Sequence, residues 1–206
     1  MVDRVLRGAE VVLTMDDERS RLTGVDVHIA GGVIAAIGPD LQVAGAESVN
    51  VAGCVLTPGL VNTHHHLYQT LTRAVPGGQD ALLFGWLQTL YPIWCNLGPD
   101  HIYWSNALAM AELALSGCTT SSDHLYLYPN GARLDDSFAA AADIGMRFHG
   151  TRGSMSIGES KGGLPPDRLT EAEPAILADC QRLIETHHNA DRYAMHRVAL
   201  APCSPF

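Results

Sequence analysis

From Leu56 onward the sequence alternates short apolar runs with long helical segments. Four runs have the length and residue types of strands: Leu60 to Thr63, Cys118 to Ser122, Met146 to Gly150 and Val198 to Ala201. Parallel neighbours in a sheet need a long crossover connection, usually a helix, so this alternation is typical of strand-helix units. It predicts an α/β fold, and a half barrel and an open doubly wound sheet both satisfy it.

Three helices are expected between these strands, over residues 100–116, 135–144 and 170–188. Asp100 is the expected N-cap of the first, and a capping box from Thr170 to Glu173 is the expected start of the third. Gly117 and Gly145 follow the first two helices, where glycine readily adopts the left-handed conformation that ends a helix.

The residues before Leu56 have a different sequence pattern, with short apolar runs, frequent turns and no helical period. Strands are expected at 9–15, 25–29 and 33–37, and Gly31-Gly32 is a two-residue hairpin signal between the last two. We therefore expect two regions, a small β unit over residues 1–56 and strand-helix units over residues 57–206.

Composition excludes several classes of partner. The 206 residues include 13 basic and 22 acidic side chains, a formal charge of -9, and no cluster of basic residues that would follow a phosphate backbone. No stretch approaches the roughly 20 apolar residues of a membrane helix, because Gln88 and Pro92 interrupt the run from Leu82 to Trp94. We therefore expect neither nucleic acid nor membrane as a partner.

The N-terminus has no basic leader followed by an apolar stretch, which predicts a cytoplasmic protein. The five cysteines are scattered and form no CxxC pair, which argues against a disulfide framework or a cysteine zinc cluster.

The strand at residues 60–63 leads directly into His64, His65 and His66. Side chains two residues apart on a strand point to the same side, so His64 and His66 are expected to converge and His65 to point to the barrel wall. Two converging imidazoles can share a divalent ion at about 2.0 to 2.1 Å. The alternative interpretation is that these histidines only cap a strand and meet solvent or backbone carbonyls.

The segment from Thr57 to Gln69, with its HxHxxQ pattern, resembles the first-strand signature of the amidohydrolase superfamily. It is most similar to the branch of 8-oxoguanine deaminases, triazine hydrolases and guanine deaminases. Three further stretches resemble the same branch: Gly117 to His124, Gly153 to Ser156 and Leu200 to Phe206. The resemblance covers essentially the whole chain. It implies the first half of a TIM-type (β/α)8 barrel, preceded by part of a small β-sandwich.

The resemblance also implies site residues. His64 and His66 would be the first two ligands of one divalent metal, zinc in preference to iron, and Gln69 would hydrogen-bond a purine. A glutamine amide suits that role because it offers both a donor and an acceptor. The Glu, His and Asp that the family uses for catalysis are expected beyond Phe206, so the chain is expected to be inactive alone.

Four further residues are weaker candidates for the substrate pocket: Trp94, His124, Arg152 and Cys203. Ordinary packing, or a surface ion pair for Arg152, is the alternative for each. The loop from Gly153 to Pro166 is rich in Gly, Ser and Pro, which suits either a mobile cover or a tolerated surface excursion.

The function implied by the resemblance is hydrolytic deamination of a purine-like ring, with 8-oxoguanine converted to uric acid and ammonia. A triazine amino- or chlorohydrolase is the alternative within catalysis, and a non-catalytic barrel scaffold is the alternative outside it. The expected partner is a small-molecule substrate, with a homo-oligomer expected for a full-length protein.

Overall fold

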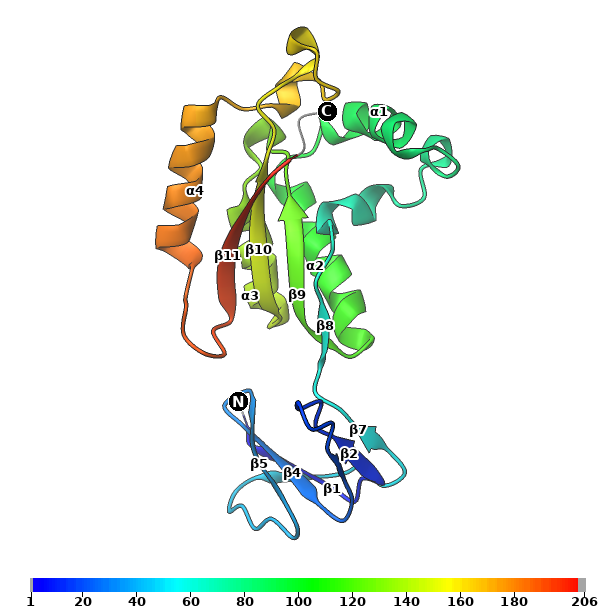
Figure 1. Cartoon of the computed structure of the whole chain (residues 1–206), viewed down its shortest axis with the longest axis vertical. Helices are drawn as coiled ribbons and strands as arrows, with labels where there is room; N and C mark the ends of the chain where they lie inside the picture. Colours follow the sequence, from blue (N-terminus) through cyan, green and yellow to red (C-terminus); the bar gives the residue numbers. More distant parts are fainter. Residues whose placement is uncertain (1, 204–206) are drawn as a thin grey trace. The chain divides into compact units, whose positions relative to one another are not determined.

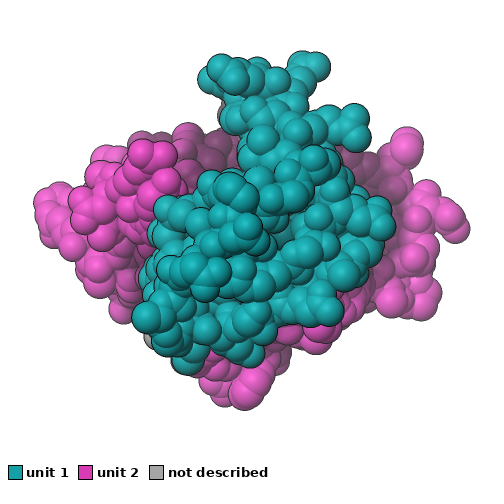
Figure 2. Space-filling view, turned by 90° about the horizontal axis from the view of Figure 1, so that it is seen from below, with its two compact units in different colours: residues 1–59 teal, residues 60–206 magenta. Residues whose placement is uncertain are grey.

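The structure is a computed structural model and describes residues 2–203. Ser204, Pro205 and Phe206, which end one of the family-like stretches, lie outside the described residues, as does Met1. The chain divides into two compact units, Met1–Gly59 and Leu60–Phe206, which Figure 2 distinguishes by colour. Each unit is described by itself.

The first unit consists of two small sheets. One has the order β5-β4-β1-β6, with strands β1 (Arg4–Arg7), β4 (Asp26–Ala30), β5 (Val33–Gly38) and β6 (Glu47–Asn50). The other has the order β3-β2-β7, with strands β2 (Val11–Leu13), β3 (Arg21–Leu22) and β7 (Val55–Leu56). Gly31 and Gly32, at φ 57° and 80°, form the predicted hairpin turn between β4 and β5. Three buried valines come from these sheets, Val12 from the second and Val5 and Val27 from the first.

The second unit is built on a four-stranded sheet that confirms the predicted α/β class. Its order is β11-β10-β9-β8, all neighbours are parallel, and the strands are β8 (Leu60–Asn62), β9 (Cys118–Leu125), β10 (Arg147–Ser154) and β11 (His196–Pro202). Because the strands are parallel, their carboxyl ends lie at one end of the sheet, as Figure 1 shows.

Four α-helices accompany this sheet: α1 (Leu83–Trp94), α2 (Pro99–Leu115), α3 (Leu134–Ile144) and α4 (Glu173–His187). Helices α2, α3 and α4 contact β9, β10 and β11 respectively. Gly117 at φ 89° and Gly145 at φ 77° adopt the predicted left-handed conformation after α2 and α3. Short 3-10 segments complete the connections: η1 (Leu67–Thr72), η2 (Pro76–Gly78), η3 (Pro129–Gly131), η4 (Glu159–Lys161) and η5 (Asp167–Leu169).

Two predicted helix starts are wrong. Helix α2 begins at Pro99 rather than after a cap from Asp100. Gly98 is its N-cap, and the Gly98 amide donates to the His101 ring at 3.1 Å. The capping box before α4 does not form, because Ala172 is the N-cap and no side chain caps it. The two side chains of the predicted box bind elsewhere: the Thr170 hydroxyl donates to the Asp167 carbonyl at 2.8 Å, and the Glu173 carboxylate accepts from the Ser156 hydroxyl at 3.3 Å.

Helix α1 was not predicted, although its buried residues repeat at helical spacing: Leu87, Leu90, Tyr91 and Trp94. Pro92 lies inside the last turn, and the Asn96 side chain donates to the Pro92 carbonyl at 2.9 Å just beyond the helix. Across residues 2–203, no helix is both long enough and apolar enough to cross a membrane.

Candidate functional site

His64 and His66 follow β8 and lie together at the carboxyl end of the sheet. Their ring centroids are 5.4 Å apart and the ring planes meet at 82°. Burial lowers the pKa of the His65 ring, and the Glu112 carboxylate of α2 opposes this shift. His64 and His66 thus lie close together, as a period of two predicts, although β8 ends at Asn62.

The end of β9 holds this histidine segment by three hydrogen bonds. The His124 amide donates to the His65 carbonyl at 2.9 Å, and the Leu67 amide donates to Asp123 Oδ1 at 2.8 Å. The third bond joins His66 Nδ1 to the His124 carbonyl at 2.8 Å. Three consecutive residues, 65 to 67, are thus fixed by two consecutive residues of β9.

The contact with the His124 carbonyl determines the tautomer of His66. A carbonyl oxygen can only accept, so His66 Nδ1 carries the proton and Nε2 keeps its lone pair. Burial lowers the pKa of His66, which favours the neutral ring. A metal-binding histidine typically has this arrangement, with one nitrogen held by a backbone carbonyl and the other free to coordinate.

The donor set fits a divalent metal only in part. His64 and His66 supply two imidazoles at one position, whereas no group of three His, Cys, Asp or Glu side chains within residues 2–203 is arranged to hold an ion. His124 does not complete the set through Nε2, since this nitrogen lies 3.1 Å from the Ala201 carbonyl and must donate to it. The described residues therefore fit as part of a larger set of ligands.

Asp123 is a fully buried carboxyl group beside this segment. Oδ1 accepts from the Leu67 amide, while Oδ2 is buried without a hydrogen-bond partner among the described residues. Burial raises the pKa of Asp123 to about 7, although the Leu67 amide opposes this shift. Asp123 therefore anchors the turn after His66 through Oδ1, while its buried Oδ2 makes no hydrogen bond with the described residues.

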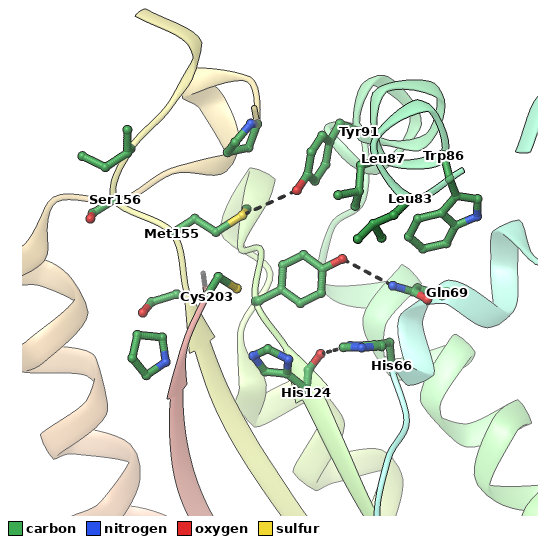
Figure 3. A pocket seen from close by; sticks show the side chains of 15 residues that line it. His66, Gln69, Leu83, Trp86, Leu87, Tyr91, His124, Met155, Ser156 and Cys203 are labelled. Atoms are coloured by element: carbon green, nitrogen blue, oxygen red, sulfur yellow. Dashed lines mark hydrogen bonds between the residues drawn. The ribbon is translucent and has the colours of Figure 1, made fainter. Parts of the chain in front are cut away.

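A cavity of about 440 Å³ opens beside these histidines, at the carboxyl ends of the strands. Figure 3 shows His66 and Gln69 on the right, Met155 and Cys203 on the left, and residues of α1 above Gln69. The α1 side chains in the wall are Leu83, Trp86, Leu87 and Tyr91. A mostly apolar wall with a few convergent polar groups is the usual form of a small-molecule site.

Four of the residues singled out in the sequence line this cavity, namely His66, Gln69, His124 and Cys203. His64 is not in the lining but is adjacent to His66. The Cys203 amide donates to the Ser154 carbonyl at 2.9 Å, and burial raises the pKa of the Cys203 thiol. Cys203 is therefore held in the wall as a neutral thiol.

Trp94 and Arg152 do not line the cavity, contrary to expectation. Trp94 is fully buried, with its indole donating to Thr72 Oγ1 at 3.1 Å and its ring packed edge-on against Tyr68. It supports the wall from behind.

Arg152 is 1% exposed and lies on the helix side of β10, because side chains alternate along the strand and Gly153 takes the opposite side. Its guanidinium donates twice to Glu171, at 2.9 and 2.8 Å, and to Asp179 of α4 at 3.1 Å. It also stacks over Tyr128, 4.1 Å from the ring centroid. Arg152 therefore ties β10 to α4 and is buried rather than part of a surface ion pair.

Residues 55–204 match the amidohydrolase family. The chain belongs to this family. It is 45% identical to the 8-oxoguanine deaminase of Pseudomonas aeruginosa over 195 residues, covering 89% of this chain and 43% of that protein. It is 37% identical to the hydroxydechloroatrazine ethylaminohydrolase of a Pseudomonas species over 220 residues, covering all of this chain and 46% of that protein.

A solved structure is also closely similar to this amidohydrolase chain. The atrazine chlorohydrolase of Arthrobacter aurescens, complexed with zinc, matches it with a TM-score of 0.90 and 31% identity. The match covers 98% of this chain and 47% of the chlorohydrolase chain. The amidohydrolase chain thus spans less than half the length of each of these relatives.

The structure adds cavity residues of this amidohydrolase that were not predicted, most importantly Tyr126, Trp86, Tyr91 and Met155. Tyr126 follows His124 by two residues, so the same alternation that pairs the histidines would have assigned both to one side of β9. Trp86 and Tyr91 depend on helix α1, and Met155 lies just after β10, which extends beyond its predicted end.

Proposed function

We propose that this chain is the first half of the catalytic domain of a metal-dependent hydrolytic deaminase, with 8-oxoguanine as the substrate. Water would replace the exocyclic amine of the ring, and uric acid and ammonia would be the products. The observation that carries the proposal is that His66 and Gln69 line one cavity and that the His64 ring lies 5.4 Å from the His66 ring. The 45% identity to an 8-oxoguanine deaminase supports the choice of ring.

We propose that β8 to β11 are the first four strands of a closed eight-stranded barrel. Their parallel order along the sheet follows the order of the chain, as it does in a (β/α)8 barrel. The similarity to the atrazine chlorohydrolase structure supports this architecture. In such a barrel the carboxyl ends of the strands carry the active site, and the cavity described above lies at that end.

His64 and His66 would hold one divalent metal ion, and we propose zinc, which the similar chlorohydrolase structure contains. When bound there, the ion would supply the Lewis acidity that makes water nucleophilic near neutral pH. The chain's own contribution is orientation. The His124 carbonyl accepts the proton on Nδ1 of His66 and so leaves Nε2 free to coordinate the metal. The apolar side chains of α1 in the cavity wall would exclude bulk water from the substrate ring.

The test is steady-state kinetics of the complete protein with 8-oxoguanine, guanine, isoguanine and hydroxylated triazines. We expect 8-oxoguanine to have the highest kcat/KM. Absence of turnover of every purine would overturn the proposed substrate. Metal analysis of the wild type and of His66→Ala tests the site itself, since the variant should lose bound metal. A metal-free protein unaffected by this substitution would favour a non-catalytic scaffold.

Hydrolysis of a triazine is the second candidate. It is favoured by the 37% identity to an ethylaminohydrolase of hydroxydechloroatrazine and by the structural similarity to an atrazine chlorohydrolase. The same kinetic panel separates the two, because this candidate requires a triazine to exceed every purine in kcat/KM.

A further inference from the structure

A second cavity, of about 380 Å³, lies at the amino ends of β9, β10 and β11. The direction of the strand arrows in Figure 1 shows that these ends are opposite to the ends that carry the histidines. The lining of this cavity includes Thr120 near the start of β9, Arg147 at the start of β10 and Arg197 near the start of β11. Its volume is in the range of pockets that hold small molecules.

The register of the strands brings basic side chains together on one side of the sheet. Arg147 of β10 lies beside Thr120 of β9, and His149 of β10 lies beside Arg197 of β11. Arg147 and His149 are two residues apart on one strand, so their side chains point to the same side. The pKa of His149 is lowered, first by burial and then by the positive charges of Arg197 and His188. The side chains around this cavity are therefore basic.

The two guanidinium groups have no acidic partner among the described residues. Backbone carbonyls before β11 hold them instead: Arg147 Nη2 donates to the Tyr193 carbonyl at 3.3 Å, and Arg197 Nη2 donates to the Ala190 and Asp191 carbonyls at 3.2 and 3.0 Å. Asp191 thus contributes its carbonyl to this contact. Arg147 Nε is buried and has no hydrogen-bond partner within the described part of the chain. Donors on both arginines therefore remain available to a ligand.

This arrangement suits an oxyanion. A guanidinium presents its N–H donors in a planar fork, which matches the oxygens of a phosphate or a carboxylate. Since backbone carbonyls already hold one nitrogen of each arginine, less side-chain ordering remains to be done when a ligand binds. The Thr120 hydroxyl can donate one further hydrogen bond. A neutral ligand would leave the two guanidinium charges without a counter-charge.

We propose that the cavity at the amino ends of β9, β10 and β11 is an oxyanion-binding site whose ligand is a small anion of the phosphate type. Arg147 and Arg197 bind the oxygens of this anion, and Thr120 donates to it. The inference does not depend on the proposed catalytic function, because no residue in the lining of this cavity also lines the histidine cavity.

The experiment measures the binding of inorganic phosphate to the complete protein by isothermal titration calorimetry, in a chloride buffer of constant ionic strength. The wild type should bind phosphate saturably. Arg147→Gln and Arg197→Gln should each weaken this affinity at least ten-fold, because each removes charge-assisted hydrogen bonds. Arg197→Lys keeps the charge but loses the planar fork, so its affinity should lie between those of the wild type and Arg197→Gln. Circular dichroism should report an unchanged fold for all variants.

Arg21→Gln is the matched control, since Arg21 of β3 is exposed and its substitution changes the net charge by the same amount. His66→Ala is the second control, because phosphate is also a ligand for metal ions, and this variant should keep the affinity of the wild type. Absence of saturable binding, equal weakening by Arg21→Gln, or loss of binding in His66→Ala would overturn the proposed site. Thermal destabilisation by Arg197→Gln in a protein that binds no phosphate would also overturn it, and would indicate that a carboxylate from another part of the protein pairs with these arginines.

Discussion

Gly153 occupies a position in β10 where no side chain fits. A Cβ atom there would lie 2.4 Å from His124 Nε2 and 2.5 Å from Tyr126 Cβ, closer than any real contact of this kind. Both neighbours belong to the cavity wall, and the His124 carbonyl also holds the ring of His66. The missing side chain therefore lets two adjacent strands bring their functional groups together.

Gly153→Ala should lower kcat/KM of the complete enzyme by about 100-fold, because a shift of roughly 1 Å in positioning groups has an effect of this size. Steady-state kinetics and metal content measure the effect. Gly85→Ala in α1 is the control, since its new Cβ would lie at an ordinary contact distance, 3.8 Å, from Ala81. Activity of Gly153→Ala at the level of this control would mean that the cavity wall yields without consequence.

At the scale of elements, Asp135 connects α3 to α4. Its carboxylate accepts from Arg182 at 2.8 and 2.7 Å and lies 3.1 Å from His187 Nε2. Burial alone would raise the pKa of Asp135, but the hydrogen bonds from Arg182 and His187 outweigh it and hold that pKa well below its ordinary value. A carboxyl whose pKa is lowered by folding stabilises the fold above its ordinary pKa and loses this contribution as the pH falls.

Asp135→Asn should therefore lower the free energy of unfolding at pH 7 by about 1 to 2 kcal/mol. The difference from wild type should shrink as the pH falls below about 4, where the unfolded carboxyl becomes protonated. Urea unfolding at pH 7 and at pH 2 measures both differences, with the exposed Asp17→Asn as the control. A difference that stays constant with pH would show that the charge of Asp135 is not involved.

The middles of these elements were predictable from sequence, whereas several ends were not. Residues 135–144 repeat with the helical period and stop at Gly145, so local chemistry determines most of α3. The start of α4 depends on a distant residue, because the Glu173 carboxylate that the capping box would use accepts from Ser156 at 3.3 Å. Trp94 and Arg152 illustrate the same limit, since their burial depends on which neighbours pack over them.

At the scale of the whole chain, strand order follows from the alternation of strands and helices, and the histidine pair follows from a period of two. The cavity does not follow from such sequence patterns, because α1 and the segment after β10 supply much of its wall. Sequence patterns indicate which residues share a side of one strand. They do not determine which helix covers the strand ends, since that depends on long-range packing.

The sheet of the second unit has β8 and β11 as its outermost strands, and apolar side chains are exposed along both. Leu60 and Val61 of β8 are 57% and 63% exposed, and Leu200 of β11 is 50% exposed. An edge strand offers unpaired backbone groups to any other strand, and apolar side chains strengthen such contacts. Residues 1–206 expressed alone should therefore self-associate, as measured by light scattering after size exclusion.

Val61→Lys should reduce this self-association, because a charged side chain on an edge strand opposes pairing between copies. Val2→Lys is the matched control, since Val2 is 65% exposed but lies outside the described strands, and it should leave the association unchanged. A wild-type chain that remains a monodisperse 22.1 kDa monomer and melts cooperatively would contradict the prediction. In the proposed full barrel further strands would cover both edges, so Val61→Lys should destabilise the complete protein while it improves the solubility of residues 1–206.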